Sequence, residues 1–304
     1  MTHFLPPGLS VIERGWLSAN LVLAQGQRPA LIDSGYVSHA EQTLQLVAAS
    51  LKGQAPELLL NTHLHSDHCG GNAALQAAYP QMRTLIPPGH ARQVADWDEE
   101  ALTYQPTGQR CPRFRFDALL QPGQDILLGD LPWQVHAAPG HDPHSVILFE
   151  PASRTLVSAD ALWENGFGVI FPELEGEEAF GEVAATLDLI EQLQPATVVP
   201  GHGPVFGMRT EVMERARQRL AGFQKDPQRH AQHAAKVLLK FKLLEVQKQT
   251  REVFMSWARN TPYLGLVHQR FFAEQVLEDW LSQLLADLAK VGAAELEEGW
   301  VLNR

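Results

Sequence analysis

The sequence predicts an α/β fold followed by a smaller, mainly helical region. Short apolar runs that indicate buried strands alternate with helical patterns over the first two thirds of the chain. Polar loops rich in histidine follow the ends of several of these strands, where an α/β scaffold usually carries its chemistry. From residue 208 the chain becomes basic, glycine-poor and helical. We therefore expect two domains, residues 1–207 and 208–304.

Length and composition are typical of a soluble globular protein. The 304 residues are enough to bury a substantial core, with 45% hydrophobic and 19% charged residues. No run of about 18 uncharged apolar residues is present, so we expect no membrane span. The first eight residues have no basic region and no long apolar run, so we expect no signal peptide. Two cysteines make no disulfide framework, which favours a cytoplasmic location.

Charge is divided unevenly between the two expected domains. Residues 1–207 carry a net charge of −14 and residues 208–304 a net charge of +3, for a total of −11. Bound divalent cations would offset part of the negative charge of the first domain. The second domain is only mildly basic.

The elements before residue 208 follow from hydrophobic spacing. Residues 38–51 have a helical pattern, and Ser38 with Glu41 fits a capping box at its start. Further helices are expected at residues 73–78, 90–102 and 178–193. Strands are expected at residues 21–24, 30–33, 58–60, 84–86, 125–129, 133–137, 145–149, 155–158 and 197–199.

The segment between the strand at 58–60 and the helix at 73–78 holds three histidines and one aspartate in six residues. These are His63, His65, Asp67 and His68, in the pattern H-x-H-x-D-H. Imidazole nitrogens and carboxylate oxygens suit zinc, and also iron or manganese. Four candidate ligands exceed the three that a catalytic zinc usually takes from the protein. The surplus indicates two ions, with further ligands from elsewhere in the chain.

Three more candidate ligands each lie just past the end of an expected strand: His141, Asp160 and His202. The order H-x-H-x-D-H, P-G-H, D, P-G-H-G-P resembles the pattern of the metallo-β-lactamase superfamily over roughly residues 15–207. This resemblance implies a metallo-β-lactamase αββα sandwich with a dinuclear metal site. Asp33-Ser34-Gly35 resembles the D-x-G loop of that family, in which the aspartate supports the metal loop without being a ligand.

The resemblance also assigns the ligands. His63, His65 and His141 would hold the first metal, Asp67, His68 and His202 the second, and Asp160 would bridge the two. Two zinc ions held in this way would share a water and lower its pKa, giving a bridging hydroxide as the nucleophile. Asp67 would be the catalytic residue that orients this hydroxide and takes its proton.

Several residues are candidates for substrate binding, each with a structural alternative. Trp163, Phe167 and Phe171 follow Asp160 and either line an apolar pocket or pack in the core. Arg113 and Arg115, which alternate with apolar residues together with Arg110, either meet a substrate anion or form a solvated basic face.

Other histidines, and the cysteine in the metal loop, also have structural alternatives to a role in the site. His144 stands where much of the family has a glycine, and it faces either the site or the solvent. Cys69 is expected to be a packed residue rather than a ligand. We assign no role to the histidines outside the pattern, at positions 90, 136, 230, 233 and 268.

Helical patterns at residues 211–223, 231–247 and 275–291 precede an expected hairpin at 292–302. This arrangement resembles a winged helix, such as the tails of β-lactamase-like ribonuclease and thioesterase-like hydrolases. The alternative is a helical cap without a ligand of its own.

Three functions are compatible with these patterns. The leading hypothesis is a metal-dependent hydrolase of a small acyl substrate, which would be a thioester, an ester or a lactone. The first alternative is a nuclease or RNA-binding hydrolase whose tail grips the backbone, with Lys236, Lys240 and Lys242 as contacts. The second is a metal-binding regulator without turnover. The weak basic charge of the tail and the acidic first domain favour the small substrate over a polyanion. The oligomeric state is left open.

Overall fold

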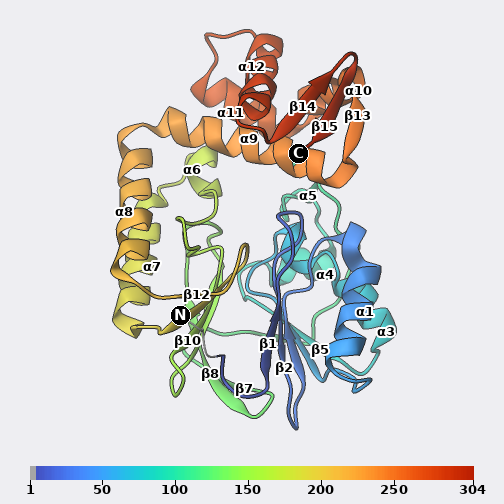
Figure 1. Cartoon of the computed structure of the whole chain (residues 1–304), viewed down its shortest axis with the longest axis vertical. Coiled ribbons are helices and arrows are strands. Elements are labelled where there is room, and N and C mark those ends of the chain that lie inside the picture. Colours follow the sequence, from blue (N-terminus) through green and yellow to red (C-terminus); the bar gives the residue numbers. More distant parts are fainter. Residues whose placement is uncertain (1–4) are drawn as a thin grey trace.

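Two six-stranded sheets stack face to face in the computed structural model, which describes residues 5–304 (Figure 1). Residues 1–4, part of the stretch on which the signal-peptide expectation rests, lie outside the described residues. In sheet order, the first sheet contains β1 (Leu9–Ile12), β2 (Leu21–Ala24), β3 (Ala30–Ile32), β4 (Leu58–Leu60), β5 (Arg83–Ile86) and β6 (Ala118–Leu119). Its pairs from β3 to β6 are parallel, and the others are antiparallel.

The second sheet has its parallel pair near one edge. In sheet order, it contains β12 (Phe206–Gly207), β11 (Thr197–Pro200), β10 (Thr155–Ala159), β9 (Val146–Glu150), β8 (Leu131–Ala137) and β7 (Asp125–Leu128). Strands β10 and β11 are parallel, and every other pair is antiparallel. Parallel strands end at the same edge of a sheet, so the loops that follow β10 and β11 lie together.

Alternating side chains on the strands build the core of the sandwich. In β2, Val22 and Ala24 point into the layer between the sheets, where Trp133 and Val199 of the second sheet meet them. The intervening Leu21 and Leu23 point outward, as the period of two in a strand requires. The outer faces are covered by α1 (Ala40–Ser50) and α3 (Asn72–Ala78) on the first sheet and by α7 (Phe180–Leu193) and α8 (Thr210–Lys225) on the second. This is the αββα sandwich that the family resemblance implies.

The C-terminal region lies across one end of the sandwich (Figure 1). It contains α9 (Pro227–Val246), β13 (Lys248–Thr250), α10 (Arg251–Asn260), α11 (Pro262–Phe271), α12 (Leu277–Lys290), β14 (Ala294–Glu297) and β15 (Trp300–Asn303). The expected terminal hairpin is present, and β13 joins it as an unexpected third strand. The region is mainly helical with a core of its own. Its identity as a winged helix stays a prediction.

Helix α8 belongs with the sandwich by its packing. Its buried residues Val212, Ala216 and Leu220 share one apolar cluster with Leu187 of α7 and Val198 of β11. The core of the C-terminal region begins only with Ala231 on α9, apart from Val169 and Leu174, the latter in the short helix α6 (Phe171–Glu175). We therefore keep the division into two parts as a proposal and place its boundary after α8, near residue 226, rather than at 207.

Local details differ from the sequence expectations in three places. The helix expected over 90–102 is only α4 (Ala91–Asp96), because Trp97 adopts left-handed backbone angles and ends it, and the short α5 (Tyr104–Thr107) forms in a segment where no helix was expected. The capping box at Ser38 does not form, since a 3-10 turn over Val37–His39 precedes α1 and its N-cap makes no side-chain hydrogen bond. Short helices α2 (Ser66–Cys69) and α6 (Phe171–Glu175) were not expected. No helix within residues 5–304 is long and apolar enough to cross a membrane.

Candidate metal centre

Four loops from both sheets meet at one end of the sandwich. Residues 61–72 follow β4 and include α2, while His141, Asp160 and His202 follow β8, β10 and β11. Backbone hydrogen bonds fix these loops to one another. The N–H of Val146 donates to the carbonyl of Thr62 at 2.8 Å, and the N–H of Asn20 donates to that of Gly201 at 2.7 Å. Side chains from different sheets are therefore held on rigid strand ends at one point.

The first group of converging side chains consists of His63, His65 and His141. His65 Nδ1 lies 3.0 Å from His63 Nε2 and 2.9 Å from His141 Nε2. Together these nitrogens form a set able to hold one metal ion. Three imidazole nitrogens around one point are the usual arrangement of a catalytic zinc site.

The second group consists of Asp67, His68 and His202. His202 Nε2 lies 3.0 Å from Asp67 Oδ2, and His68 Nε2 lies 3.8 Å from the same oxygen. These three atoms also form a set able to hold one ion.

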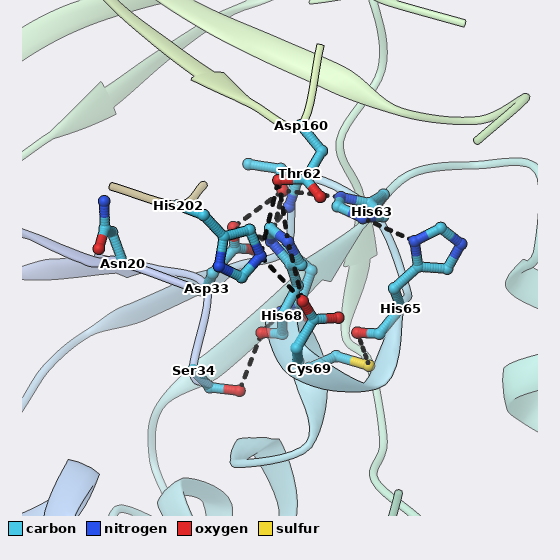
Figure 2. Close-up of polar contacts among 12 residues, drawn as sticks. Asn20, Asp33, Ser34, Thr62, His63, His65, His68, Cys69, Asp160 and His202 are labelled. Atoms are coloured by element: carbon cyan, nitrogen blue, oxygen red, sulfur yellow. Dashed lines mark hydrogen bonds and ion pairs between the residues drawn. The ribbon is translucent and has the colours of Figure 1, made fainter. Parts of the chain in front are cut away.

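Asp160 lies between the two groups, and each of its carboxylate oxygens faces one of them. Oδ2 is 3.4 Å from His141 Nε2 of the first group. Oδ1 is 3.4 Å from His68 Nε2 and 3.9 Å from His202 Nε2 of the second group. Figure 2 shows His63, His65, His68, His202 and Asp160 directed toward a common centre. The two oxygens of this one carboxylate thus face the two ligand groups.

Hydrogen bonding fixes which ring nitrogens are free to bind a cation. His141 Nδ1 donates to the carbonyl of Val169 at 2.5 Å, so in the neutral ring Nε2 presents a lone pair to the cluster. His65 Nδ1 carries at most one proton, yet it lies within hydrogen-bond distance of two other ring nitrogens. This single in-plane site cannot form a hydrogen bond with both rings, whereas a cation between the three nitrogens could bind a lone pair from each.

In the second group, the contact between His68 and Asp33 likewise leaves one ring nitrogen free to bind a cation. His68 Nδ1 is 2.8 Å from Asp33 Oδ2, so the ring is oriented by that carboxylate. Its Nε2 is buried without a hydrogen-bond partner and faces the cluster. An unpartnered nitrogen aimed at two carboxylates fits a metal ligand whose outer nitrogen is held by a carboxylate. The residues present therefore fit a metal site.

The electrostatics of the cluster favour positive charge at its centre. Burial lowers the pKa of His63 well below its usual value, with a further lowering from His68, so the ring is neutral as a ligand must be. Burial acts to raise the pKa of Asp160, but His202 and His68 hold it well below its usual value. Burial acts to lower the pKa of His68, while Asp33 and Asp160 raise it above its usual value. The surrounding carboxylates thus stabilise a cation at this position.

Asp33 supports the metal loop, as the sequence predicted. Besides orienting His68, it accepts hydrogen bonds from the N–H of Thr62 at 2.9 Å and the hydroxyl of Thr62 at 2.8 Å. Asp33 adopts a left-handed φ of 61°, a conformation that aspartate tolerates better than most residues.

Close packing against Asp160 explains why the residue before His202 in the P-G-H motif is a glycine. A Cβ at Gly201 would collide with Asp160 Oδ1. Only glycine lets the loop that carries His202 approach the central carboxylate so closely.

A cavity of about 430 Å³ opens above the cluster. We call the cluster side the floor; it presents His65, Asp67, His141, Asp160 and His202 to the cavity. We call the opposite side the roof; it consists of Arg219 from α8, His233, Val237, Leu238 and Phe241 from α9, and Tyr263 from α11. Because the roof is provided by helices after residue 207, the C-terminal part of the chain completes the cavity.

The structure brings two of the six substrate-binding candidates to the cavity. Trp163 and Phe171 line it, and Trp163 Nε1 donates to Asp160 Oδ1 at 3.3 Å. Phe167 does not line it, since its ring is 1% exposed and packs in the core beside Phe223.

The other three candidates do not line the cavity, and their role in substrate binding stays a prediction. Arg113 donates to the carbonyl of Ala95 and Arg115 to that of Pro80. His144 packs against His90 with ring centroids 4.5 Å apart, on the far side of its loop from the floor.

Cys69 is a packed residue, as expected. It is fully buried, and its Sγ lies 3.7 Å from that of Cys111 and 3.2 Å from Tyr104 Oη. All three belong to a small apolar cluster beneath the metal loop.

Sequence reasoning missed Trp16 on the floor side and the whole roof. Trp16 is 56% exposed and stacks on His202 with ring centroids 5.4 Å apart. No signal in the sequence distinguished Trp16, because a single apolar residue in a polar stretch is ordinary. His233, which received no role, lies in the roof.

Comparisons with known proteins agree with this geometry. Residues 14–202 match the family model described as the metallo-beta-lactamase superfamily. The chain belongs to the metallo-β-lactamase superfamily. It is a metal-dependent hydrolase of that superfamily.

The chain is similar to two curated relatives and shares its fold with one solved structure. It is 26% identical over 207 residues to the human acyl-coenzyme A thioesterase MBLAC2, covering 62% of this chain and 74% of that one. It is 33% identical over 147 residues to a hydroxyacylglutathione hydrolase of Anaeromyxobacter dehalogenans, covering 48% of this chain and 47% of that one. The metallo-beta-lactamase family protein TTHA1429 of Thermus thermophilus shares the fold over 99% of this chain and 100% of its own, with a TM-score of 0.59 at 19% identity.

Proposed function

We propose that this protein is a dinuclear metal hydrolase of small acyl substrates, with thioesters as the preferred class. The observation that carries the proposal is the cavity of about 430 Å³ enclosed between the metal-binding floor and the apolar roof. Sites for small molecules commonly measure about 300–1,000 Å³ and combine apolar walls with a few polar groups. The enclosed volume suits an acyl group and part of its leaving group.

The seven floor and loop residues predicted from the sequence are the proposed metal ligands. His63, His65 and His141 hold one ion, Asp67, His68 and His202 hold the other, and Asp160 bridges them. Zinc suits this mixture of imidazole and carboxylate, and iron or manganese is the alternative. When bound, the ions supply a water activated at neutral pH and polarise the scissile carbonyl.

Asp67 is the proposed catalytic residue. It lines the cavity, and His202 Nε2 holds its Oδ2 at 3.0 Å. Burial acts to raise the pKa of Asp67, but His68 and His202 lower it, so the carboxylate is ionised. Asp67 is therefore placed to hold a water at the floor and to accept its proton.

The thioester class is supported by the two relatives described above. One is named an acyl-coenzyme A thioesterase and the other a hydroxyacylglutathione hydrolase. Both names describe removal of an acyl group from a carrier. The apolar side chains of Val237, Leu238 and Phe241 in the roof suit such an acyl group.

The described residues do not favour a nucleic-acid substrate. The cavity is lined by five carboxylates and one arginine, which would repel a polyanion. The three lysines predicted as RNA contacts have partners within the chain. Lys236 pairs with Asp287 and Lys242 with Glu245, while Lys240 donates to the carbonyl of Ala293 and to the C-terminal residues.

A substrate panel tests the proposal. Metal-reconstituted protein is assayed with thioesters, lactones, phosphodiesters and single-stranded RNA. We expect turnover of thioesters, with lactones or esters slower and no cleavage of RNA. Preferred cleavage of phosphodiesters would overturn the proposal in favour of the nuclease, and no turnover by protein that holds two ions would favour a metal-binding regulator.

A further inference from the structure

Arg219 on α8 lines the cavity without a carboxylate partner. Its Nη2 donates to His233 Nε2 at 2.8 Å, and its Nε is buried without an acceptor. The guanidinium carbon lies 5.6 Å from the ring centroid of Phe167 and 5.1 Å from that of Phe223. Within residues 5–304, no carboxylate lies within 4.0 Å of its nitrogens.

The neighbouring arginines show that this arrangement is particular to Arg219. Arg217, two residues earlier on α8, forms ion pairs with Asp188 and Glu191. Arg209 pairs with Glu164, whose carbonyl accepts two hydrogen bonds from Arg215. Each of these three satisfies local backbone or carboxylate groups, whereas Arg219 turns toward the cavity.

The partner of Arg219 does not neutralise it. Burial, together with the charge of Arg219, lowers the pKa of His233 to about 3, so this ring is neutral and accepts the hydrogen bond through Nε2. The two aromatic faces add attraction to a cation but no negative charge. The positive charge of Arg219 is therefore uncompensated, and burial lowers its pKa from the usual value.

The local backbone leaves room for this side chain. Gly166 has a φ of 118°, and a Cβ there would lie 2.7 Å from Arg219 Cδ. Arg219 is thus held against the loop that carries Trp163, which lines the same cavity. On α9, His233, Val237 and Phe241 are spaced four residues apart and share one face. The roof therefore runs from a cationic end at Arg219 to an apolar end at Phe241.

We propose that Arg219 binds an anionic group, a carboxylate or a phosphate, on the part of the substrate that does not react. This inference rests on the proposed acyl hydrolase function. An arginine fork recognises either group through two parallel hydrogen bonds; Nη1, for which residues 5–304 provide no acceptor, can give one of them and the second N–H of Nη2 the other. The anion is either a carboxylate at the far end of the acyl group or a phosphate of the thiol carrier.

Three thioesters distinguish these sources: glutaryl-pantetheine carries a carboxylate on the acyl side, butyryl-CoA carries phosphates on the thiol side, and butyryl-pantetheine carries neither. We expect Arg219→Met to reduce kcat/KM for one of the two anionic substrates by roughly 10- to 100-fold, the usual effect of losing a hydrogen bond to a charged group. The neutral substrate should change less than about threefold. The affected substrate identifies the source of the anion.

Arg217→Met is the matched control, because it removes the same charge from the same helix outside the cavity. It should leave all three substrates unchanged. Arg219→Lys keeps the charge without the fork and serves as a second variant if Arg219→Met does not fold; we expect an intermediate loss confined to the same anionic substrate. An equal loss on all three thioesters, or no loss on either anionic one, would overturn the inference.

Calorimetry separates this inference from the proposed function. The metal-loaded protein is titrated with glutarate and, separately, with pyrophosphate, and each Kd is compared between wild type and Arg219→Met. We expect a weaker Kd in the variant for one of the two anions even if no thioester is turned over. Identical Kd values for both anions would contradict the role of Arg219 while leaving hydrolysis of neutral thioesters untouched.

Discussion

The floor and the roof of the cavity are built in different ways. The floor is made of charged and polar side chains on strand ends, and each is held by bonds to other strand ends. Asp33 alone makes contacts to Thr62 and His68 that fix two positions of the metal loop. The roof is made mostly of apolar side chains on helices. The groups proposed for the reaction are therefore held rigidly by hydrogen bonds. The groups proposed for substrate selection are held mainly by apolar packing, so we expect substitutions among them to be better tolerated.

Few polar contacts attach the helices that carry most of the roof, α9 and α11, to the sandwich. The N–H of Ile170 donates to His230 Nε2 at 3.1 Å, and the hydroxyl of Tyr263 donates to the carbonyl of Phe171 at 3.2 Å. Glu245 near the end of α9 accepts from Tyr36 and pairs with Arg110. Changes in the floor should therefore abolish activity, while changes in the roof should alter selectivity or attachment.

The largest expected effect is at the floor. Asp67→Asn keeps the shape and one coordinating oxygen but removes the charge and the proton acceptor. Because losing general-base help commonly lowers rates by about 10²- to 10⁴-fold, we expect kcat to fall by that amount on every substrate. Turnover is measured alongside circular dichroism and metal content. Full activity in a variant that retains both metals would show that Asp67 has no catalytic role.

The attachment of the roof should weaken in acid through His230. Burial, with Arg219, lowers the pKa of this side chain to about 4 in the folded protein, below its usual 6.5. The unfolded chain therefore binds a proton that the folded chain does not between these values. Stability from this group is complete above about pH 6.5 and is lost as the pH falls toward 4, by about 3 kcal/mol in all.

His230→Gln keeps an acceptor for the N–H of Ile170 but does not titrate. We expect its free energy of unfolding to fall less steeply than that of the wild type between pH 6.5 and 4 in urea titrations. Parallel curves for the two proteins would mean that His230 does not couple the roof to pH.

A smaller effect should come from Phe241 in the roof. Its ring lines the cavity and meets Tyr36 edge-on at 5.1 Å between centroids. Phe241→Ala enlarges the apolar end, so we expect relative kcat/KM to shift toward longer acyl groups by about tenfold, as changes of a few methylenes do in apolar pockets. Rates are compared across a series of acyl lengths. Val276→Ala, at a 65% exposed position, is the control, and an unchanged length preference in Phe241→Ala would remove the roof from substrate selection.

The same difference explains what the sequence could predict. The candidate metal ligands could be predicted because they lie in short motifs at strand ends. Four of the seven fall within His63 to His68. Short apolar runs indicated the strands that these loops follow, without knowledge of tertiary contacts. The two-sheet fold followed from the same pattern together with the family resemblance.

The residues of the roof could not be predicted from the sequence. Val237 and Phe241 have ordinary helical spacing, which indicates a buried face but does not say against which part of the molecule it lies. Arg219 and His233 meet only because α8 and α9 pack together after a sharp turn at Asp226. The sequence left open whether Arg113 and Arg115 meet an anion or form a solvated face, because alternation alone does not show which face of an extended segment meets the cavity.

Metal stoichiometry tests the central claim most directly. Wild-type protein stripped of metal and titrated with zinc, then measured by elemental analysis, should bind close to two ions per chain, in keeping with two ligand groups sharing one carboxylate. Asp160→Ala should weaken the binding of both ions, because each carboxylate oxygen faces a different group. Saturation of the wild type at one ion, or loss of only one ion in Asp160→Ala with the other bound at unchanged affinity, would contradict the dinuclear site.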